Sequence, residues 1–288
     1  MRTTRHLLIA LGFIFALAIL AGAQTETKQP DPLELLENVQ TTYGAMTSFS
    51  AKATMHMDMS GTGMQTQTSM AMTLQIDSSG RMRAESAGPI GMTMVNDGTT
   101  VWMYMPQENQ YFKMPLPSNG SAEAGGDFPF PETGGFSELK NVAKNVKEAK
   151  VLRAETVQAN GTKVSCWVVS VEYERTGNND PGPSAQADST QSDSAQGEAT
   201  GADFRSIGNA NTKMLWIAKT SYLVYREDQT DTVPMPKTGV TMHINMGMTY
   251  DDIVVDHPIP QSTFTFTPPA GATEMRPPST SKTPSKQP

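Results

Sequence analysis

The sequence predicts a mainly β protein with minor α content, in which a strongly bent antiparallel sheet of about eleven strands is accompanied by two helices. Three observations support this prediction. Two long runs alternate apolar and polar residues with period two, glycine turns separate them, and further hairpin signals recur along most of the remaining chain.

The longest predicted element is a hairpin over residues 49–77, turned at residues 60–63. Its alternation places one set of side chains on a single face: Phe49, Ala51, Ala53, Met55, Met57, Met59, Met70, Met72, Leu74 and Ile76. At about 3.3 Å per residue, each strand spans roughly 40 Å, a length typical of a bent sheet or barrel wall. Methionine crowds this face where Val and Ile are the usual strand residues.

Two helices are predicted on either side of the meander. Over residues 31–46, Asp31 is placed to cap the first turn and Pro32 falls at its first position. The expected buried stripe of this helix is Leu36, Val39, Tyr43 and Met46. Residues 136–149 are predicted as a second helix from the spacing of Leu139, Val142, Ala143 and Val146.

The remaining strands are expected at residues 81–86, 90–95, 101–105, 110–114, 151–159, 162–173, 214–217, 222–226 and 240–255. Asn96-Asp97-Gly98 is the strongest hairpin signal among their turns. Alternation in these strands adds Met82, Met92, Met94, Met242, Met246 and Met248 to the expected apolar lining.

The ends of the chain and its polar stretches predict one folded domain. Residues 1–23 have the basic, apolar and A-x-A regions of a cleaved secretory signal peptide, so we expect a periplasmic or extracellular protein. Residues 24–30 are a linker, residues 31–272 form the domain, and residues 273–288 are a disordered tail. Within the domain, residues 175–211 are predicted to be disordered. The loop over residues 115–135 is either a lid or a plain connector.

Charge and cysteine content exclude several classes of function. Without Arg2 and Arg5, 20 basic residues face 29 acidic ones, a net charge near −9. Such a chain is a poor partner for nucleic acid. One cysteine, Cys166, leaves no internal disulfide and no cysteine-based metal site, and we expect its thiol to be buried and inert.

No catalytic or cofactor-binding motif is present in the sequence, so we expect neither an enzyme nor a cofactor. Three interpretations of the methionines stay open. They are an adaptable apolar lining for a guest such as an acyl chain, they are an ordinary core against which the helices pack, or they are thioether ligands for copper. The apolar lining is preferred, with no metal ligand assigned, because the pattern continues through Ala, Leu and Ile.

Five stretches resemble the outer-membrane lipoprotein carrier and sorting proteins of the LolA/LolB-like superfamily. They are residues 43–49, 81–85, 96–104, 215–220 and 259–272, the last with a Phe-x-Phe-x-Pro-Pro-x-Gly ending. The resemblance implies an unclosed antiparallel β-barrel of about eleven strands, whose concave face holds acyl chains beneath helices. It also implies that Arg83 helps to govern lid closure.

On this resemblance we expect a periplasmic monomer that carries or sorts lipoprotein acyl chains or another lipid. An inner-membrane donor and an outer-membrane acceptor are the implied partners, although relatives also include periplasmic sensors of envelope stress. The predicted cavity lining is Phe49, Met55, Met57, Met59, Met70, Met72, Leu74, Met82, Met92, Met94, Met242, Met246 and Met248.

Overall fold

The computed structural model of the chain describes residues 29–61, 63–88, 91–116, 136–174, 212–235 and 240–275. The predicted signal peptide and the predicted disordered insert lie outside these ranges. So do most of the loop at 115–135, the end of the tail and part of the linker. In the described ranges, no helix has the length and apolar character needed to cross a membrane.

The elements follow one another as α1 (Pro32–Ala45), β1 (Ser48–Gly61), β2 (Met64–Asp77), β3 (Met82–Ser86), β4 (Met92–Asn96), β5 (Thr100–Met105), β6 (Gln110–Pro115), α2 (Phe136–Leu139), β7 (Val146–Ala159), β8 (Thr162–Tyr173), β9 (Thr212–Ala218), β10 (Val224–Met235), β11 (Val240–Val255), the 3-10 turn η3 (Gln261–Phe264) and β12 (Thr273–Glu274). The eleven predicted strands are all present. The twelfth, β12, falls at the start of the predicted tail.

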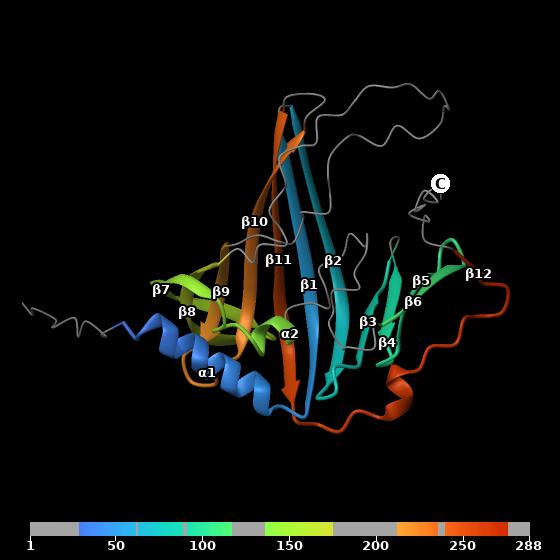
Figure 1. Ribbon diagram of the computed structural model, residues 1–288, viewed down its shortest axis with the longest axis horizontal. Coiled ribbons are helices and arrows are strands. Elements are labelled where there is room, and N and C mark those ends of the chain that lie inside the picture. The colour runs from blue at the N-terminus through green and yellow to red at the C-terminus, as the bar shows by residue number, and fades with distance from the viewer. Residues whose placement is uncertain are drawn as a thin grey trace, which may run out of the picture.

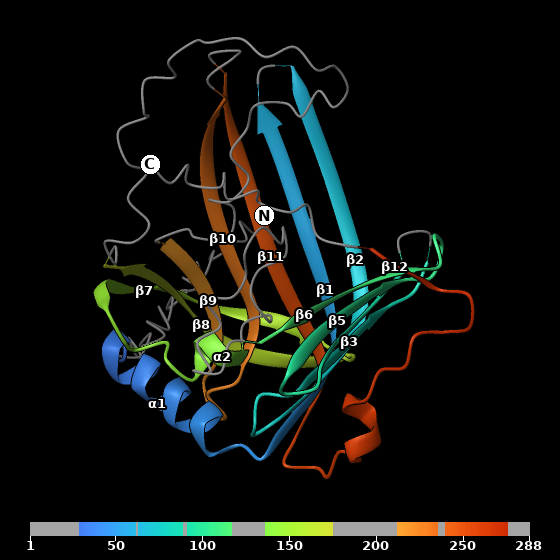
Figure 2. The ribbon, with the colours of Figure 1, turned by 45° about the vertical axis from the view of Figure 1, so that its right-hand side comes forward.

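All described strands belong to one open sheet in the order β12-β6-β5-β4-β3-β2-β1-β11-β10-β9-β8-β7. Neighbouring strands pair antiparallel, except that β12 runs parallel to β6. Figures 1 and 2 show the long strands β1, β2, β10 and β11 extending far beyond the level of α1, with β3–β6 and β7–β9 on either side of them. The predicted mainly β, unclosed sheet is confirmed, while closure toward a barrel stays a prediction.

The first helix forms as the sequence predicts. Oδ1 of Asp31 accepts hydrogen bonds from the backbone N–H groups of Leu33 (2.8 Å) and Glu34 (3.1 Å), which caps the helix. Three residues of the expected stripe, Leu36, Val39 and Tyr43, are at most 1% exposed. Because these side chains are buried, α1 is held against the sheet by its apolar face.

The second predicted helix is wrong over most of its length. Only the single turn of α2 is helical, and Val146 already begins β7. Between them Asn145 adopts φ = 54°, in the left-handed region that interrupts a right-handed helix. Backbone pairing between β7 and β8 then outweighs the helical spacing of the apolar residues.

The main core lies at one end of the sheet, between the sheet and the two helices. Phe49 of β1 contacts the rings of Tyr43 in α1 and Phe136 in α2, at centroid distances of 6.1 and 5.5 Å. Leu139 of α2 and Tyr250 of β11 belong to the same core. Helices therefore cover one end of this face, and their extension over the rest of it stays a prediction.

A C-terminal strap, residues 256–275, crosses the other face of β3–β6. Phe264 is 2% exposed and lies beneath the guanidinium of Arg81, 4.9 Å from its ring centroid. Phe266 contacts the rings of Trp102 and Tyr104, at 5.7 and 5.8 Å. The Phe-x-Phe ending thus anchors the strap, and β12 then pairs with the edge strand β6.

Candidate ligand-binding face

Strand register gathers most of the 20 methionines on one face of the sheet. Met55 of β1 lies opposite Met70 of β2 and Met248 of β11, and Met94 of β4 lies opposite Met103 of β5. We call the whole set the methionine face: Met55, Met57, Met59, Met70, Met72, Met82, Met92, Met94, Met103, Met105, Met114, Met242, Met246 and Met248.

The predicted lining residues divide into two groups by burial. Phe49, Leu74 and Met82 are 2–4% exposed and packed inside the main core, and Met248 belongs to that core as well. Eight are half-buried: Met55, Met57, Met59, Met70, Met72, Met92, Met94 and Met242. The half-buried group leaves apolar surface beyond the part of the face that α1 and α2 fill.

Packing along β1 and β11 links the part of the methionine face next to the main core with the part farther along the long strands. Met55, Met72 and Met94 pack against the main core. Farther along the long strands, Met57 and Met59 pack against Met246 and Ile244, two residues that are at most 4% exposed. The apolar surface therefore continues without a polar break from the core into the extension of the long strands.

The opposite face of β1, β10 and β11 is polar, so the two faces of these strands differ in character. There, Nε2 of His56 lies 3.4 Å from Oδ1 of Asp228, and Nε of Arg226 donates to that oxygen at 3.0 Å. Gly247 separates His56 and Asp228 in the sheet, where a Cβ atom would lie 2.3 Å from the imidazole. Only a glycine allows the two side chains to meet across β11.

A stripe of charged residues borders the methionine face along β10 and β9. Glu227 lies opposite Met248, and its Oε1 accepts a hydrogen bond from the Tyr250 hydroxyl at 2.7 Å. Burial raises the pKa of the Glu227 carboxyl. Burial also raises the pKa of Tyr250 well above its usual value, and the neighbouring Glu227 raises it further. Lys213 of β9 forms an ion pair with Glu138 of α2.

Several carboxylates act on the ammonium group of Lys213. Burial disfavours its ammonium form, but Glu138 and Glu227 outweigh burial and raise the pKa of Lys213, with Asp231 contributing further. Asp231 of β10 lies opposite Ile244 and is 8% exposed. Three carboxylates thus act on one ammonium group beside the apolar face.

Sequence reasoning missed two parts of this site. Met103, Met105 and Met114 share the face, and the period-two pattern of residues 101–105 was the signal that could have placed the first two. The charged stripe had no such signal, because residues 227–232 of β10 are polar at every position. Tertiary pairing alone decides which of them point to the methionine side.

Arg83 lies on the polar side of β3. Its Nη2 contacts Oε1 of Glu85 at 2.5 Å, and its Nη1 donates to the carbonyl oxygen of Thr263 in the C-terminal strap at 3.2 Å. Gln75 and Val95 are its neighbours in the sheet. These contacts tie Arg83 to the strap, and its role in lid closure stays a prediction.

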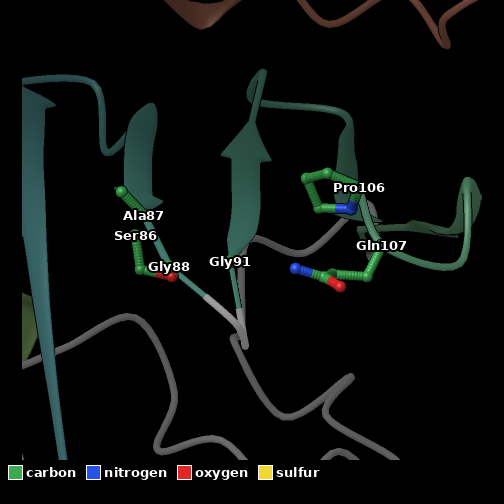
Figure 3. A pocket seen from close by; sticks show the side chains of 6 residues that line it. All are labelled: Ser86, Ala87, Gly88, Gly91, Pro106 and Gln107. Atoms are coloured by element: carbon green, nitrogen blue, oxygen red, sulfur yellow. The ribbon is translucent and has the colours of Figure 1, made fainter.

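An open pocket of about 400 Å³ lies at the ends of β3–β6 (Figure 3). Its lining is Ser86, Ala87, Gly88, Gly91, Pro106 and Gln107. None of these is a methionine or a charged residue. The pocket therefore lies among the turns at the sheet border and shares no residue with the predicted lining, although Ser86 pairs with Met72 and Met92 in the sheet.

Metal-binding side chains of the usual kinds are not gathered in the described part of the chain. No three side chains of His, Cys, Asp or Glu there are arranged so that they could hold a metal ion. Cys166 is buried, as predicted, and burial raises the pKa of its thiol to about 11. What distinguishes the site chemically is thus the thioethers.

Comparison with known proteins agrees with the predicted compartment. The model of a family described as a predicted periplasmic protein (DUF2092) matches residues 33–163, a little under half of the chain. That description confirms the periplasmic location predicted from the leader. No curated protein matches the sequence.

Several solved structures resemble the chain at low sequence identity. An uncharacterized conserved protein from Thermus thermophilus is 12% identical, with 85% of this chain and 98% of that one covered and a TM-score of 0.43. LprF from Mycobacterium bovis is 11% identical, with 85% of this chain and 98% of that one covered and a TM-score of 0.40. A LolA superfamily protein from Nitrosomonas europaea is 10% identical, with 83% of this chain and 99% of that one covered and a TM-score of 0.31. A LolA superfamily protein is thus among the structures that the chain resembles.

Proposed function

We propose that this protein is a non-enzymatic periplasmic carrier or sorter that holds acyl chains of a lipoprotein, or another amphiphile, on its methionine face. The observation that supports this most is the continuation of that face beyond the core. Met57, Met59 and Met70 are half-buried on the long strands, and none of them belongs to the main core or packs against it. A contiguous apolar surface of this kind is a binding surface more often than a structural one.

Methionine suits an irregular apolar guest. Its side chain is unbranched and polarisable, so it adapts to ligands of different shape. Burial of an acyl chain stabilises the complex by about 0.8 kcal/mol per CH₂, or about 13 kcal/mol for 16 carbons before association costs. Half of that gain would still hold a lipid in water.

The location and the resemblance agree with this role. A predicted leader and a family described as periplasmic place the protein between two membranes, where lipids must cross water. A carrier there exchanges its cargo with an inner-membrane donor and an outer-membrane acceptor, and we propose partners of these two kinds. The cargo headgroup is left open by the methionine face, which offers only apolar contacts.

The proposal is tested by native mass spectrometry of the exported protein. We expect lipid to co-purify with the wild type and to be lost in Met57→Lys and Met72→Lys, because an ammonium group on the face cannot be desolvated by an acyl chain without cost. Gln67→Lys is the matched control, since Gln67 is exposed on the opposite face of β2. Circular dichroism checks that all variants fold.

Two results would contradict the proposal. One is a wild-type protein free of lipid even after incubation with phospholipid vesicles. The other is lipid retained equally by Met57→Lys, Met72→Lys and Gln67→Lys, which would place the lipid away from the methionine face.

A further inference from the structure

The outer edge of β2 has no described strand beside it over the half that lies far from α1. β2 pairs with β1 along its whole length without a bulge. On its other side β3 pairs with it only from Met72 to Ile76, beside its lower part in Figure 1. We call the remaining stretch, residues 64–71, the free edge. Residues 65–69 are all exposed, and every second residue of such an edge presents its backbone N–H and C=O groups outward, where another strand can pair with them.

The other borders of the described sheet carry features that prevent edge pairing. The border strand β7 shifts its register at two points and has five charged residues between positions 147 and 155. β10, beyond its pairing with β9, contains Asp231 and Pro234, a charged residue and one without an N–H group. The outer side of β6 is paired with β12. Charges, bulges and prolines are the usual means by which sheets avoid joining through their edges. The free edge has none of them, because the chain has no charged residue and no proline from Met59 to Ile76.

The charge of the chain favours a second copy as the partner of the free edge. With a net charge near −9 after loss of the leader, two copies repel each other over most of their surfaces. The free edge is uncharged, so two copies that meet there place no like charges opposite each other. Its central residues are Gln, Thr and Ser, and Thr pairs across antiparallel strands are stabilising.

Symmetry determines the register of such a pair. Two identical edges pair antiparallel about a twofold axis perpendicular to the sheet, which leaves both methionine faces on the same side. Directly opposed residues point to one side, so even-numbered residues, such as Thr66 and Thr68 on the methionine face, must oppose even-numbered ones. Centring the pair on Gln67 places Thr66 opposite the partner's Thr68 and uses residues 64–70. Centring it on Thr68 would bring the partner's residue 64 to Met72, which is already paired with β3.

We propose that two copies of this chain pair antiparallel through their free edges, with Gln67 on the twofold axis, and form one continuous sheet. Their methionine faces then lie side by side. The described part of each copy has one such edge, so the assembly closes at two copies. The inference concerns assembly and goes beyond the proposed function, and it departs from the monomer expected from the family resemblance.

The first test is cysteine cross-linking of the exported protein. Opposed Cα atoms of antiparallel strands are about 4.5–5.5 Å apart, a distance that a disulfide spans. Gln67→Cys should therefore form an intermolecular disulfide on oxidation with diamide, seen as a dimer on a non-reducing gel. Ser69→Cys is the matched control, because Ser69 is exposed on the same face but lies about 14 Å along the strands from the partner's Ser69. Its cross-linked yield should be at least about 10-fold lower. The native Cys166 is buried and should not react.

The second test is sedimentation velocity over a series of protein concentrations. We expect the wild type to reach twice the mass of one mature chain. Gln67→Lys brings two ammonium groups together at the axis and should weaken dimerisation at least about 10-fold. Thr73→Lys is the matched control, since Thr73 is exposed on the same face of β2 but its outer side is paired with Glu85 of β3. Its dimerisation should stay within about 3-fold of wild type. Circular dichroism checks that all variants fold.

The inference is overturned if the wild type is monomeric at every concentration, which would leave an extended peptide of another protein as the alternative partner of the free edge. It is also overturned if Gln67→Cys and Ser69→Cys cross-link equally, if Gln67→Lys dimerises as the wild type does, or if assembly continues beyond two copies. Lipid retention is measured on the same samples by native mass spectrometry. A wild type that dimerises without lipid contradicts only the proposed carrier, and one that holds lipid as a monomer contradicts only the edge pairing.

Discussion

At the scale of single residues, Asp97 shows how one side chain fixes a turn of the meander. Its Oδ1 accepts hydrogen bonds from the backbone N–H groups of Thr99 and Thr100, both at 2.8 Å. Oδ2 accepts a hydrogen bond from Nε1 of Trp102 at 3.0 Å. Gly98, at φ = 94°, supplies the left-handed conformation that the turn needs. The hairpin predicted from Asn96-Asp97-Gly98 is thereby confirmed, with its carboxylate as the organising group.

The hydrogen bonds of Asp97 make its contribution to stability dependent on pH. Burial disfavours its charge, but hydrogen bonds from Thr99 and Trp102 outweigh burial and lower the pKa of Asp97. A folded-state pKa below the unfolded value means that the stabilisation is present above pH ~4 and is lost as the pH falls through the folded pKa. We expect Asp97→Asn to cost about 1 kcal/mol at pH 7.

Urea unfolding at pH 7 and near pH 3 checks this prediction. The stability difference between wild type and Asp97→Asn should shrink at the lower pH, while the exposed Glu148→Gln control should show little difference at either pH. A difference that stays constant between the two pH values would show that the charge of Asp97 is not what stabilises the turn.

At the scale of elements, the C-terminal strap is the part whose loss should matter most to the sheet. Phe264 is buried against β3, and Phe266 is half-buried on β5. Removing a buried Phe side chain costs about 3–5 kcal/mol, since the space is not refilled. We expect Phe264→Ala to lose stability in this range and to weaken hydrogen-exchange protection of β6, which β12 covers.

Phe266→Ala provides the comparison within the same strap. Its partly exposed ring should contribute less, so the free energy of unfolding should fall by a smaller amount than in Phe264→Ala. Equal losses in both variants, or unchanged exchange of β6 in Phe264→Ala, would contradict the anchoring role of Phe264.

Elements with strict alternation were predictable from sequence, and elements without it were not. The β11 bounds follow from the alternation of Met242, Ile244, Met246 and Met248. The strand β10 extends nine residues past the predicted end at Arg226, because its polar residues give no period to detect. The two-residue strand β12 is set by its pairing with β6 alone, which a single sequence does not encode locally.

At the scale of the whole molecule, most of the methionines share one face of the sheet, while the other face is polar on β1, β10 and β11 and apolar beneath the strap and in the cluster around Trp216. The sequence predicted which methionines share a face, since alternation within each strand determines it. It did not predict that Phe49, Leu74 and Met82 lie in the core, because that depends on where α1 and α2 pack. Nor did it predict the carboxylates beside the methionine face, which lie there because β10 pairs with β11.

The most direct measurement of the central claim is an NMR titration of protein labelled with ¹³C at its methionine methyl groups, using palmitate as the ligand. Half-buried methionines of the face, such as Met57, Met59 and Met72, should shift on binding. Met46 in the core and Met214 on the opposite side of β9 should not. Shifts confined to Met46 or Met214, or no shifts at saturating palmitate, would contradict the claim that the methionine face holds the acyl chain.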